Sequence, residues 1–362
     1  MTSRRSLVVA ALLAGAEARA QGAVTLVVAG DVVVHRRVAE SAARHAADGG
    51  YAWVLAPLRS ELAPEMVAFA NLETPLSERY RRPGNATPPV LGAEPSLAGA
   101  LAAAGFDAVS VANNHSLDQT AAGLAETMDA LAAARVSFAG AGRSPAEAER
   151  AAVIERGGLR VALVAFTDRV NAGPGPNPGG ISLALSPDGA RVARALRAAR
   201  RGADVVALSI HWSRDFAYAP TAAQRRLARA WVDAGADVIV GTGPHVLQRV
   251  ERVTSPRGEA VVAWSLGNLV SNQGSLHEPG GASRADPERC PFARDGALLR
   301  VTVARDGERV RVRALEAVPL WTENDRAGVV RASPLRDATA AVRAERRPAI
   351  AAALGPAVTL VD

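Results

Sequence analysis

The sequence contains no lysine, and all 42 of its basic residues are arginine. This excludes chemistry that needs a lysine amine, such as a Schiff base or the phosphate loop of nucleotide-binding proteins. Cysteine occurs once, at Cys290, so neither a disulfide framework nor a multi-cysteine zinc site can form. Aromatic residues make up only 4% of the chain, so aliphatic side chains and alanine must fill its core.

Long apolar runs and dense basic runs are also absent. A membrane-spanning helix needs about 20 consecutive apolar residues, and we expect none after residue 20. The arginines are scattered and are not interleaved with aromatic residues, so we expect no nucleic-acid partner. With 49% hydrophobic and 22% charged residues, the 362-residue chain has the composition of a globular protein.

The first twenty residues have the pattern of a signal peptide. Arg4 and Arg5 precede a short apolar stretch over residues 7–14, and residues 18–20 (Ala-Arg-Ala) fit the small-x-small cleavage pattern. We therefore expect residues 1–20 to be removed and the protein to be periplasmic or secreted. The paired arginines fit a twin-arginine signal, which exports folded proteins, and they also fit an ordinary Sec signal.

Beyond residue 20, short apolar runs alternate with amphipathic segments, which predicts an α/β fold with parallel strands. Strands are expected over residues 24–29, 66–70, 107–112, 136–138, 161–166, 205–210 and 238–240. Helices are expected over residues 95–104, 120–134, 191–201 and 222–234. Antiparallel strands should follow near residues 247–254, 260–266, 297–304 and 309–317. The Gly- and Pro-rich residues 171–180 predict a loop that serves as a linker or a lid.

Five of the predicted strands end in groups that can bind a metal ion. Because the carboxyl ends of parallel strands meet at one edge of a sheet, where α/β proteins bind ligands, we expect these groups to lie together. Carboxylate, amide oxygen and imidazole ligands suit Mn, Fe, Zn or Mg. The groups are Asp31, Glu73, Asn114 with His115, His211 and His245.

The motifs around these groups occur in a recognisable order: Gly-Asp, Asn-Leu-Glu, Asn-Asn-His-Ser-Leu-Asp, His-Trp, Gly-Pro-His-Val-Leu-Gln and Ser-Leu-Gly-Asn. This order resembles the CapA family of capsule or poly-γ-glutamate synthesis proteins, a branch of the calcineurin-like metallophosphoesterase superfamily. The resemblance covers about residues 24–270. It implies a four-layer, metallophosphatase-like sandwich of two β-sheets flanked by helices over residues 21–332. Residues 333–362 would form a C-terminal helical extension that packs on this domain.

The resemblance also implies a role for individual residues. The implied ligands of one or two divalent ions are Asp31, Glu73, Asn114, His211 and His245. His115 would stabilise the transition state or protonate the leaving group, and Asp118 would orient the His115 ring. Arg36 and Asn268 would bind or support the substrate.

Two positions lack a ligand that related proteins carry. The superfamily usually has a metal-binding histidine two residues after the first aspartate, where this chain has Val33, an apolar residue as is typical of CapA proteins. CapA proteins usually read His-Pro-His where this chain has Gly243 followed by Pro244 and His245. Water or substrate would have to complete the coordination shell, and a single-metal or a metal-free protein stays open as an alternative.

The sequence therefore favours two functions. The first is a metal-dependent hydrolase that uses metal-activated water on a phosphoester or on an anionic polymer such as poly-γ-glutamate. The pair formed by His115 and Asp118 favours this function, because binding alone needs no oriented acid. The alternative is a non-catalytic accessory protein that binds an anionic polymer during capsule assembly or export, alongside membrane partners of capsule synthesis. The missing ligands favour this alternative.

Overall fold

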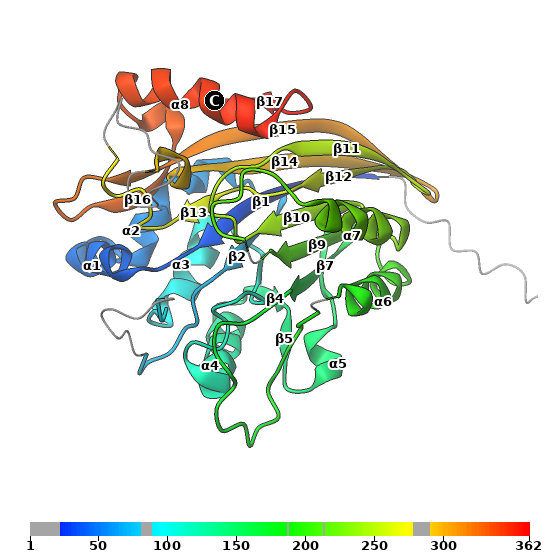
Figure 1. Ribbon diagram of the computed structural model, residues 1–362, viewed down its shortest axis with the longest axis horizontal. Coiled ribbons are helices and arrows are strands. Elements are labelled where there is room, and N and C mark those ends of the chain that lie inside the picture. Colours follow the sequence, from blue (N-terminus) through cyan, green and yellow to red (C-terminus); the bar gives the residue numbers. More distant parts are fainter. Residues whose placement is uncertain (1–21, 81–88, 187, 213, 278–289) are drawn as a thin grey trace, which may run out of the picture.

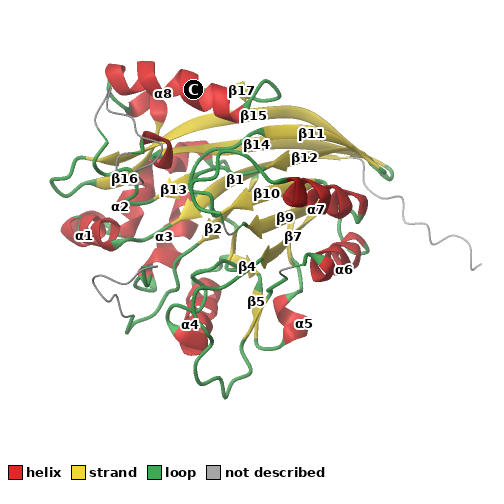
Figure 2. Ribbon diagram, viewed as in Figure 1, coloured by secondary structure: helices red, strands yellow, loops and turns green. Residues whose placement is uncertain are grey.

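A computed structural model describes residues 22–80, 89–186, 188–212, 214–277 and 290–362. The expected signal peptide at residues 1–20 lies outside these ranges. The described chain is a mixed α/β structure, in which a large sheet lies between helices (Figures 1 and 2). This confirms the fold class expected from the alternating pattern.

The elements follow the order expected from the sequence, with additional short ones. The strands are β1 (Gly22–Val32), β2 (Val67–Leu72), β3 (Ala108–Ser110), β4 (Ser137–Ala139), β5 (Ala141–Gly142), β6 (Ala152–Arg156), β7 (Leu159–Thr167), β8 (Ser182–Leu183), β9 (Val205–His211), β10 (Val238–Thr242), β11 (Val250–Ser255), β12 (Gly258–Ala263), β13 (Asn268–Val270), β14 (Asp295–Asp306), β15 (Arg309–Asn324), β16 (Val330–Pro334) and β17 (Thr359–Leu360). The α-helices are α1 (Arg36–Arg44), α2 (Tyr51–Leu55), α3 (Ser96–Ala104), α4 (Thr120–Ala133), α5 (Pro145–Ala148), α6 (Ala190–Arg200), α7 (Ala222–Asp233) and α8 (Ala340–Leu354). Short 3₁₀ helices are η1 (Ala46–Asp48), η2 (Ala56–Glu61), η3 (Pro291–Ala293) and η4 (Leu335–Asp337).

Local sequence explains where several of these elements lie. Strands β9 and β10 are fully buried apolar runs, which is typical of parallel strands covered on both faces. Helix α7 begins at a capping box in which Thr221 and Gln224 bind each other's backbone N–H groups with their side chains. Helix α3 ends at Gly105, whose φ of 108° is in the left-handed region that favours glycine.

The main sheet consists of two parallel groups of strands joined by antiparallel ones. Its order is β4-β3-β2-β1-β14-β15-β12-β10-β9-β7-β6. Strands β1 to β4 are parallel, and so are β12, β10, β9 and β7. One pair of residues, Gly258 opposite Val310, joins β12 to β15. The two expected sheets are therefore the two halves of one continuous sheet.

The continuous sheet folds over, so that its two parallel groups face each other across an apolar core. Strand β1 contacts β7 and β10, which are distant from it in the strand order. Side chains of both groups, such as Val28, Phe69, Leu163 and Val240, share this central cluster. Helices α1 to α4 cover one outer face, and α6 and α7 cover the other. The order helix, sheet, sheet, helix gives the four layers that the sequence predicts.

The segment over residues 333–362 contains the expected helix, α8, which lies along β15 in Figure 1. Its Ile350 and Leu354 belong to the central apolar cluster. The segment is not only helical, because the boundary at residue 332 falls inside β16 and because β17 pairs in parallel with β15. The chain from residue 330 onward therefore completes the sheet as well as covering it.

Candidate metal centre

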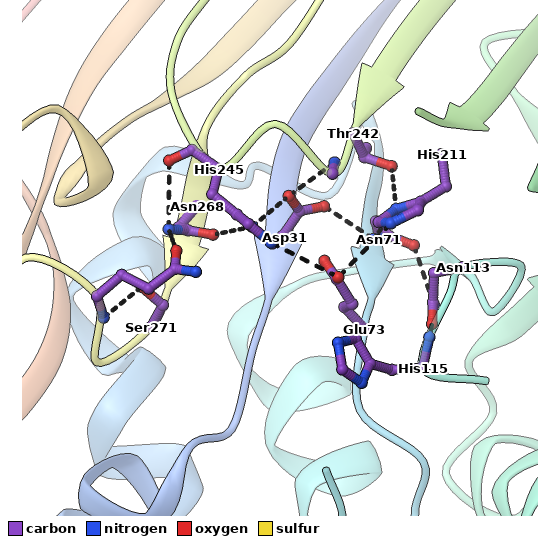
Figure 3. A network of polar contacts seen from close by, with 12 residues as sticks. Asp31, Asn71, Glu73, Asn113, His115, His211, Thr242, His245, Asn268 and Ser271 are labelled. Atoms are coloured by element: carbon purple, nitrogen blue, oxygen red, sulfur yellow. Dashed lines mark hydrogen bonds and ion pairs between the residues drawn. The ribbon is translucent and has the colours of Figure 1, made fainter. Parts of the chain in front are cut away.

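The polar groups predicted at strand ends meet at one edge of the folded sheet (Figure 3). Asp31 lies next to the end of β1, and Glu73 directly follows β2. His211 is the last residue of β9, which belongs to the opposite parallel group. Because the two groups face each other, carboxylates from one half of the sheet meet an imidazole from the other half.

Asp31, Glu73 and His211 form a compact group of metal-binding side chains. One ligand atom of each lies within 4.8 Å of the others, and all three side chains are buried. The distance between His211 Nε2 and Glu73 Oε1 is 3.6 Å. Three of the five residues that the sequence proposes as ligands are thus at distances that a single ion can bridge.

The carboxylate of Glu73 has no hydrogen-bond partner for either oxygen among the described residues, although both oxygens are buried. The Oδ1 atom of Asn114 is also buried without a hydrogen-bond partner among the described residues. Burial, together with the charge of Asp31, raises the pKa of Glu73 well above its usual range. Buried acceptors without partners are rare in proteins because they lose the solvation of water. A divalent cation would satisfy the two oxygens of Glu73, so the group formed by Asp31, Glu73 and His211 fits a metal site.

His211 is held as a neutral imidazole. Burial is the main reason that its pKa falls to about 3, and the charges of His245 and His115 lower it further against the attraction of Asp31. Thr242 Oγ1 lies 3.1 Å from His211 Nδ1 and can accept a hydrogen bond from the Nδ1–H group. The lone pair of Nε2 then faces Glu73, which is the form of histidine that binds metals.

Both oxygens of Asp31 accept hydrogen bonds from the protein. Asn71 Nδ2 donates to Oδ1 at 2.8 Å, and the backbone N–H of Gly243 donates to Oδ2 at 3.0 Å. His245 Nδ1 lies 3.2 Å from the same Oδ2. Burial alone would raise the pKa of Asp31, but the hydrogen bond and charge of His245, with Asn71 and His211, lower it. Asp31 is therefore a stabilised carboxylate, unlike Glu73.

His245 turns its Nδ1 atom toward protein oxygens. Besides Asp31, Nδ1 faces Asn268 Oδ1 at 3.0 Å, and Nε2 lies 3.8 Å from Glu73 Oε1. Burial would lower the pKa of His245, but the charge of Glu73 and the bond to Asp31 raise it to about 10. In this arrangement His245 is a cation whose direct partner is Asp31, and Glu73 lies farther from it.

Asn268 positions His245, which corrects its expected role in substrate binding. Its Oδ1 faces His245, while its Nδ2 donates to Gln273 Oε1 at 2.8 Å and to the Ala293 carbonyl at 2.9 Å. The side chain is also buried. Because both ends of the amide are bound by protein, no atom of it is left for a substrate.

Gly243 occupies a position that a histidine cannot fill with this backbone. Its φ of 95° is in the left-handed region that side chains rarely adopt. A Cβ atom there would lie 2.5 Å from the Trp212 carbonyl oxygen and 2.8 Å from His211 Nε2. The space that a histidine side chain would need at position 243 is therefore filled by the Trp212 backbone and the His211 ring.

His115 and Asp118 pair as the sequence predicts. The distance between His115 Nδ1 and Asp118 Oδ2 is 2.6 Å, and the Leu91 N–H donates to the same carboxylate oxygen at 2.7 Å. On the other side of the ring, Asn171 Nδ2 lies 3.4 Å from His115 Nε2. Asp118 thus fixes the proton on Nδ1 and leaves Nε2 directed away from it.

Arg36 is not brought to this group. Its side chain is 79% exposed and pairs with Glu40 at 3.2 Å on the surface of α1.

The loop over residues 171–180, by contrast, is hydrogen-bonded to segments of the site. The Asn171 N–H donates to the Asn114 carbonyl, and the Pro174 carbonyl accepts from the Ala121 N–H, both at 2.8 Å.

Sequence reasoning missed several residues that hold the ligands in place: Asn71, Asn113, Thr242 and Asn171. Asn113 Nδ2, for example, donates to the Leu72 carbonyl at 2.8 Å and so joins the ends of β2 and β3. The period-two alternation of a strand places Asn71 on the same side as Glu73, a signal that could have identified it. Thr242 stands opposite His211 in the β9–β10 register, which is not readable from the sequence.

The fold and this site define an α/β protein with a buried carboxylate and histidine group at the edge of a folded sheet. A family model described as "Bacterial capsule synthesis protein PGA_cap" matches residues 25–273. The chain belongs to this family, which confirms the expected relationship.

Curated relatives carry corresponding names. The chain is similar to the capsule biosynthesis protein CapA of Bacillus anthracis, with 32% identity over 257 residues, covering 69% of this chain and 60% of that protein. It is also similar to the PGA biosynthesis protein CapA of Bacillus subtilis (strain 168), with 32% identity over 177 residues, covering 47% of this chain and 43% of that protein. The chain thus spans less than two thirds of the length of both relatives.

Solved structures similar to the chain include a phosphatase of Mycoplasma pneumoniae, with a TM-score of 0.46 and 16% identity over 85% of this chain and 96% of that one. The calcineurin-like phosphoesterase YfkN of Bacillus subtilis gives a TM-score of 0.41 and 10% identity over 91% of this chain and 98% of that one.

Within the described part of this chain, no helix combines the length and the apolar character needed to cross a membrane.

Proposed function

We propose that this chain is an exported, CapA-like protein of capsule or poly-γ-glutamate biosynthesis that acts as a metal-dependent hydrolase. Its substrate would be a phosphoester or an anionic polymer. Membership of the capsule synthesis family and the names of the Bacillus relatives support the biological context. The observation that carries the enzymatic part is the buried, unpartnered carboxylate of Glu73 beside Asp31 and His211.

Asp31, Glu73 and His211 would hold a divalent ion such as Mn, Fe, Zn or Mg. Their oxygen and imidazole donors suit these ions. When bound, such an ion acts as a Lewis acid and makes water a stronger nucleophile near neutral pH. Asn71 and Thr242 orient the ligands by holding Asp31 Oδ1 and His211 Nδ1.

His115 is placed to move a proton at its Nε2 atom. Asp118 accepts a hydrogen bond of 2.6 Å from His115 Nδ1 and stabilises the imidazole ring when that ring is doubly protonated. The Nε2 atom can then give a proton to a leaving oxygen or nitrogen, which is the usual contribution of a histidine acid. Asn171, 3.4 Å from Nε2, would be replaced by the substrate atom that receives this proton.

The charge around the site supports an anionic substrate. His245 is cationic, with its pKa raised to about 10 by Glu73 and Asp31. The charge of Arg169, in the loop after β7, reaches the site and contributes to the low pKa of His211. Positive groups at a site attract phosphate and carboxylate substrates and stabilise the negative charge that develops during hydrolysis.

A second candidate is the non-catalytic accessory protein that binds an anionic polymer. Gly243, in place of a histidine ligand, and the engagement of His245 by Asn268 favour it, because they leave fewer ligands for catalytic ions. The two functions differ in turnover, since only the hydrolase predicts that a bound substrate is cleaved.

The test is hydrolysis by purified protein of a generic aryl phosphodiester and of poly-γ-glutamate, followed by product release and by polymer length. We expect turnover that chelation abolishes and that Mn or Zn restores. Polymer binding without turnover at any metal concentration would contradict the hydrolase and favour the accessory protein.

Export is tested separately. N-terminal sequencing of protein recovered from the periplasm or the medium should give a sequence that begins at Gln21.

A further inference from the structure

A small, strongly basic cleft lies outside the candidate metal centre, between α1 and the turn that joins β15 to β16. It has a volume of about 150 Å³. Four arginines and one glutamate line it, so four positive charges face one negative charge. The charged lining residues are Arg36, Arg37, Glu40, Arg44 and Arg326.

The walls of this arginine cleft are held by specific contacts. Ser41 Oγ accepts from the Val330 N–H at 2.9 Å and donates to the Val330 carbonyl at 3.1 Å, which fastens α1 to β16. Asp325 accepts from three successive backbone N–H groups, those of residues 327–329, and so fixes the turn. The backbone of both walls is therefore fixed by contacts that do not involve the arginines.

Arg44 is held by the wall of the cleft, and Arg37 has an unpartnered nitrogen. Arg44 Nη1 donates to the Ala327 carbonyl at 3.2 Å, and its guanidinium lies against Gly328, where a Cβ would come within 2.9 Å of Arg44 Cζ. Arg37 Nη1 is buried but has no hydrogen-bond partner among the described residues. A buried guanidinium nitrogen without an acceptor is unfavourable. Because Arg37 lines the cleft, an anion bound there would offset the charge of its guanidinium.

The cleft is joined to the metal centre by a chain of amides and one histidine. Asn268, which holds His245, donates to Gln273 at 2.8 Å. Asn272, the neighbour of Gln273, accepts from Asn324 of the cleft at 3.1 Å. The Asn272 N–H also donates to His35 Nδ1 at 3.3 Å, directly before α1. The cleft therefore lies on the same edge of the sheet as the metal centre, a short segment away.

We propose that the arginine cleft binds carboxylate groups of an anionic polymer, at a point remote from the bond that reacts. Arginine forks match carboxylates in a bidentate manner, and several forks in one cleft favour a repeating polyanion over a single ion. This inference rests on the polymer named in the proposed function and adds the place where part of that polymer is held. Arg36, which the sequence assigns to substrate binding, would act here and not at the metal centre.

The test is binding of a fluorescent γ-linked oligoglutamate, measured by anisotropy at low and high salt, with unfolding temperatures recorded for each protein. We expect Arg37→Gln and Arg44→Gln each to weaken binding about tenfold, the loss expected for one charge-assisted contact. Arg37→Lys should fall between Arg37→Gln and the wild type, because lysine keeps the charge but loses the fork. Arg311→Gln, which removes an exposed arginine of β15, is the matched control and should bind as the wild type does.

Wild-type affinity in both cleft variants would overturn the proposal, and so would an absence of oligoglutamate binding by the wild type. Equal competition by inorganic phosphate would show that the cleft takes a single small anion, which also contradicts a polymer site. Hydrolysis of the aryl phosphodiester by the same variants separates the two proposals. The cleft variants should keep this activity, whereas failure of the hydrolase itself would remove it from the wild type.

Discussion

Glu61 and Glu73 are both buried carboxylates, 5% and 0% exposed, but the chain neutralises only one of them. Glu61, at the end of η2, pairs with Arg336 and Arg300 and accepts from Ser60. Glu73 pairs with no arginine of the described chain. Its histidine neighbours are the neutral ring of His211 at 3.6 Å and the cationic ring of His245 at 3.8 Å. In a sequence with 42 arginines, the missing partner at Glu73 marks a place for a cation from solution.

The pKa values express the same contrast. Burial alone would raise the pKa of Glu61, but Arg336, Ser60 and Arg300 hold it below its usual value. Burial and Asp31 raise the pKa of Glu73 well above that value. A carboxylate that the protein leaves uncompensated is a feature of functional sites, whereas one that it compensates serves stability. Four experiments test this comparison.

The largest effect is expected for Glu73→Gln. Loss of a group that merely supports a metal ligand costs about 10–100-fold in metal affinity, so loss of a ligand should cost at least that and abolish turnover. Mn or Zn should raise the unfolding temperature of the wild type but not of the variant. Without metal, the variant should be at least as stable as the wild type, because an amide needs no counter-charge. Normal metal uptake by Glu73→Gln would contradict this assignment.

The next effect is on turnover alone. His115→Ala should lower kcat by about 10²–10⁴-fold, the usual contribution of a general acid, with bound metal unchanged. Asp118→Asn should lower kcat less, since the ring remains but loses its fixed proton at Nδ1. Steady-state kinetics on the aryl phosphodiester, with metal content measured in parallel, is the check. Full activity in His115→Ala would end the catalytic role of this histidine.

The third experiment restores the histidine that related proteins carry. Gly243→His should lower the free energy of unfolding by about 1–3 kcal/mol, because the left-handed backbone and the contact with the Trp212 carbonyl oppose a side chain. It should bind no additional ion. The control is Gly99→His in α3, an exposed position where a Cβ would meet no atom within 4 Å. Normal stability with a gain of one ion would show that the missing histidine is merely an absent ligand.

The last substitution changes the compensated carboxylate and completes the comparison. Glu61→Gln should reduce the free energy of unfolding by about 1.5–3 kcal/mol by removing charged hydrogen bonds. Because the folded-state pKa of Glu61 is lowered, this contribution is present above its ordinary pKa of 4.5 and is lost as pH falls through the folded-state value. Denaturant unfolding between pH 3 and 7 should show the gap between variant and wild type closing at low pH, with or without metal. A constant gap would contradict the ion-pair explanation.

The sequence predicted those features that depend on local pattern. The apolar runs of β1, β2, β9 and β10 identified the strands. The rule that ligands gather at the carboxyl ends of parallel strands then sufficed to group Asp31, Glu73 and His211. Helix α2 escaped prediction because it is only five residues long. The short strand β13 escaped because three residues carry no periodic signal.

What the sequence could not predict depends on tertiary approach. Nothing local indicates that Asn268 would bind His245, or that Gly243 would lie against the Trp212 carbonyl. The same holds for Asn171, which comes from a loop whose Gly- and Pro-rich pattern predicts no partner and yet reaches His115. The contrast between Glu61 and Glu73 is likewise invisible in sequence, since the arginines that pair with Glu61 lie more than 200 positions away.

The most direct test of the central claim is the metal content of protein purified without chelator, with uptake followed by titration. We predict about one divalent ion per chain, as expected for three protein ligands completed by water, and loss of that ion in Glu73→Gln. Two ions would show that His245 leaves Asn268 and Asp31 to bind metal. No ion, and none taken up on titration, would contradict the account and leave the unpartnered carboxylate of Glu73 without its cation.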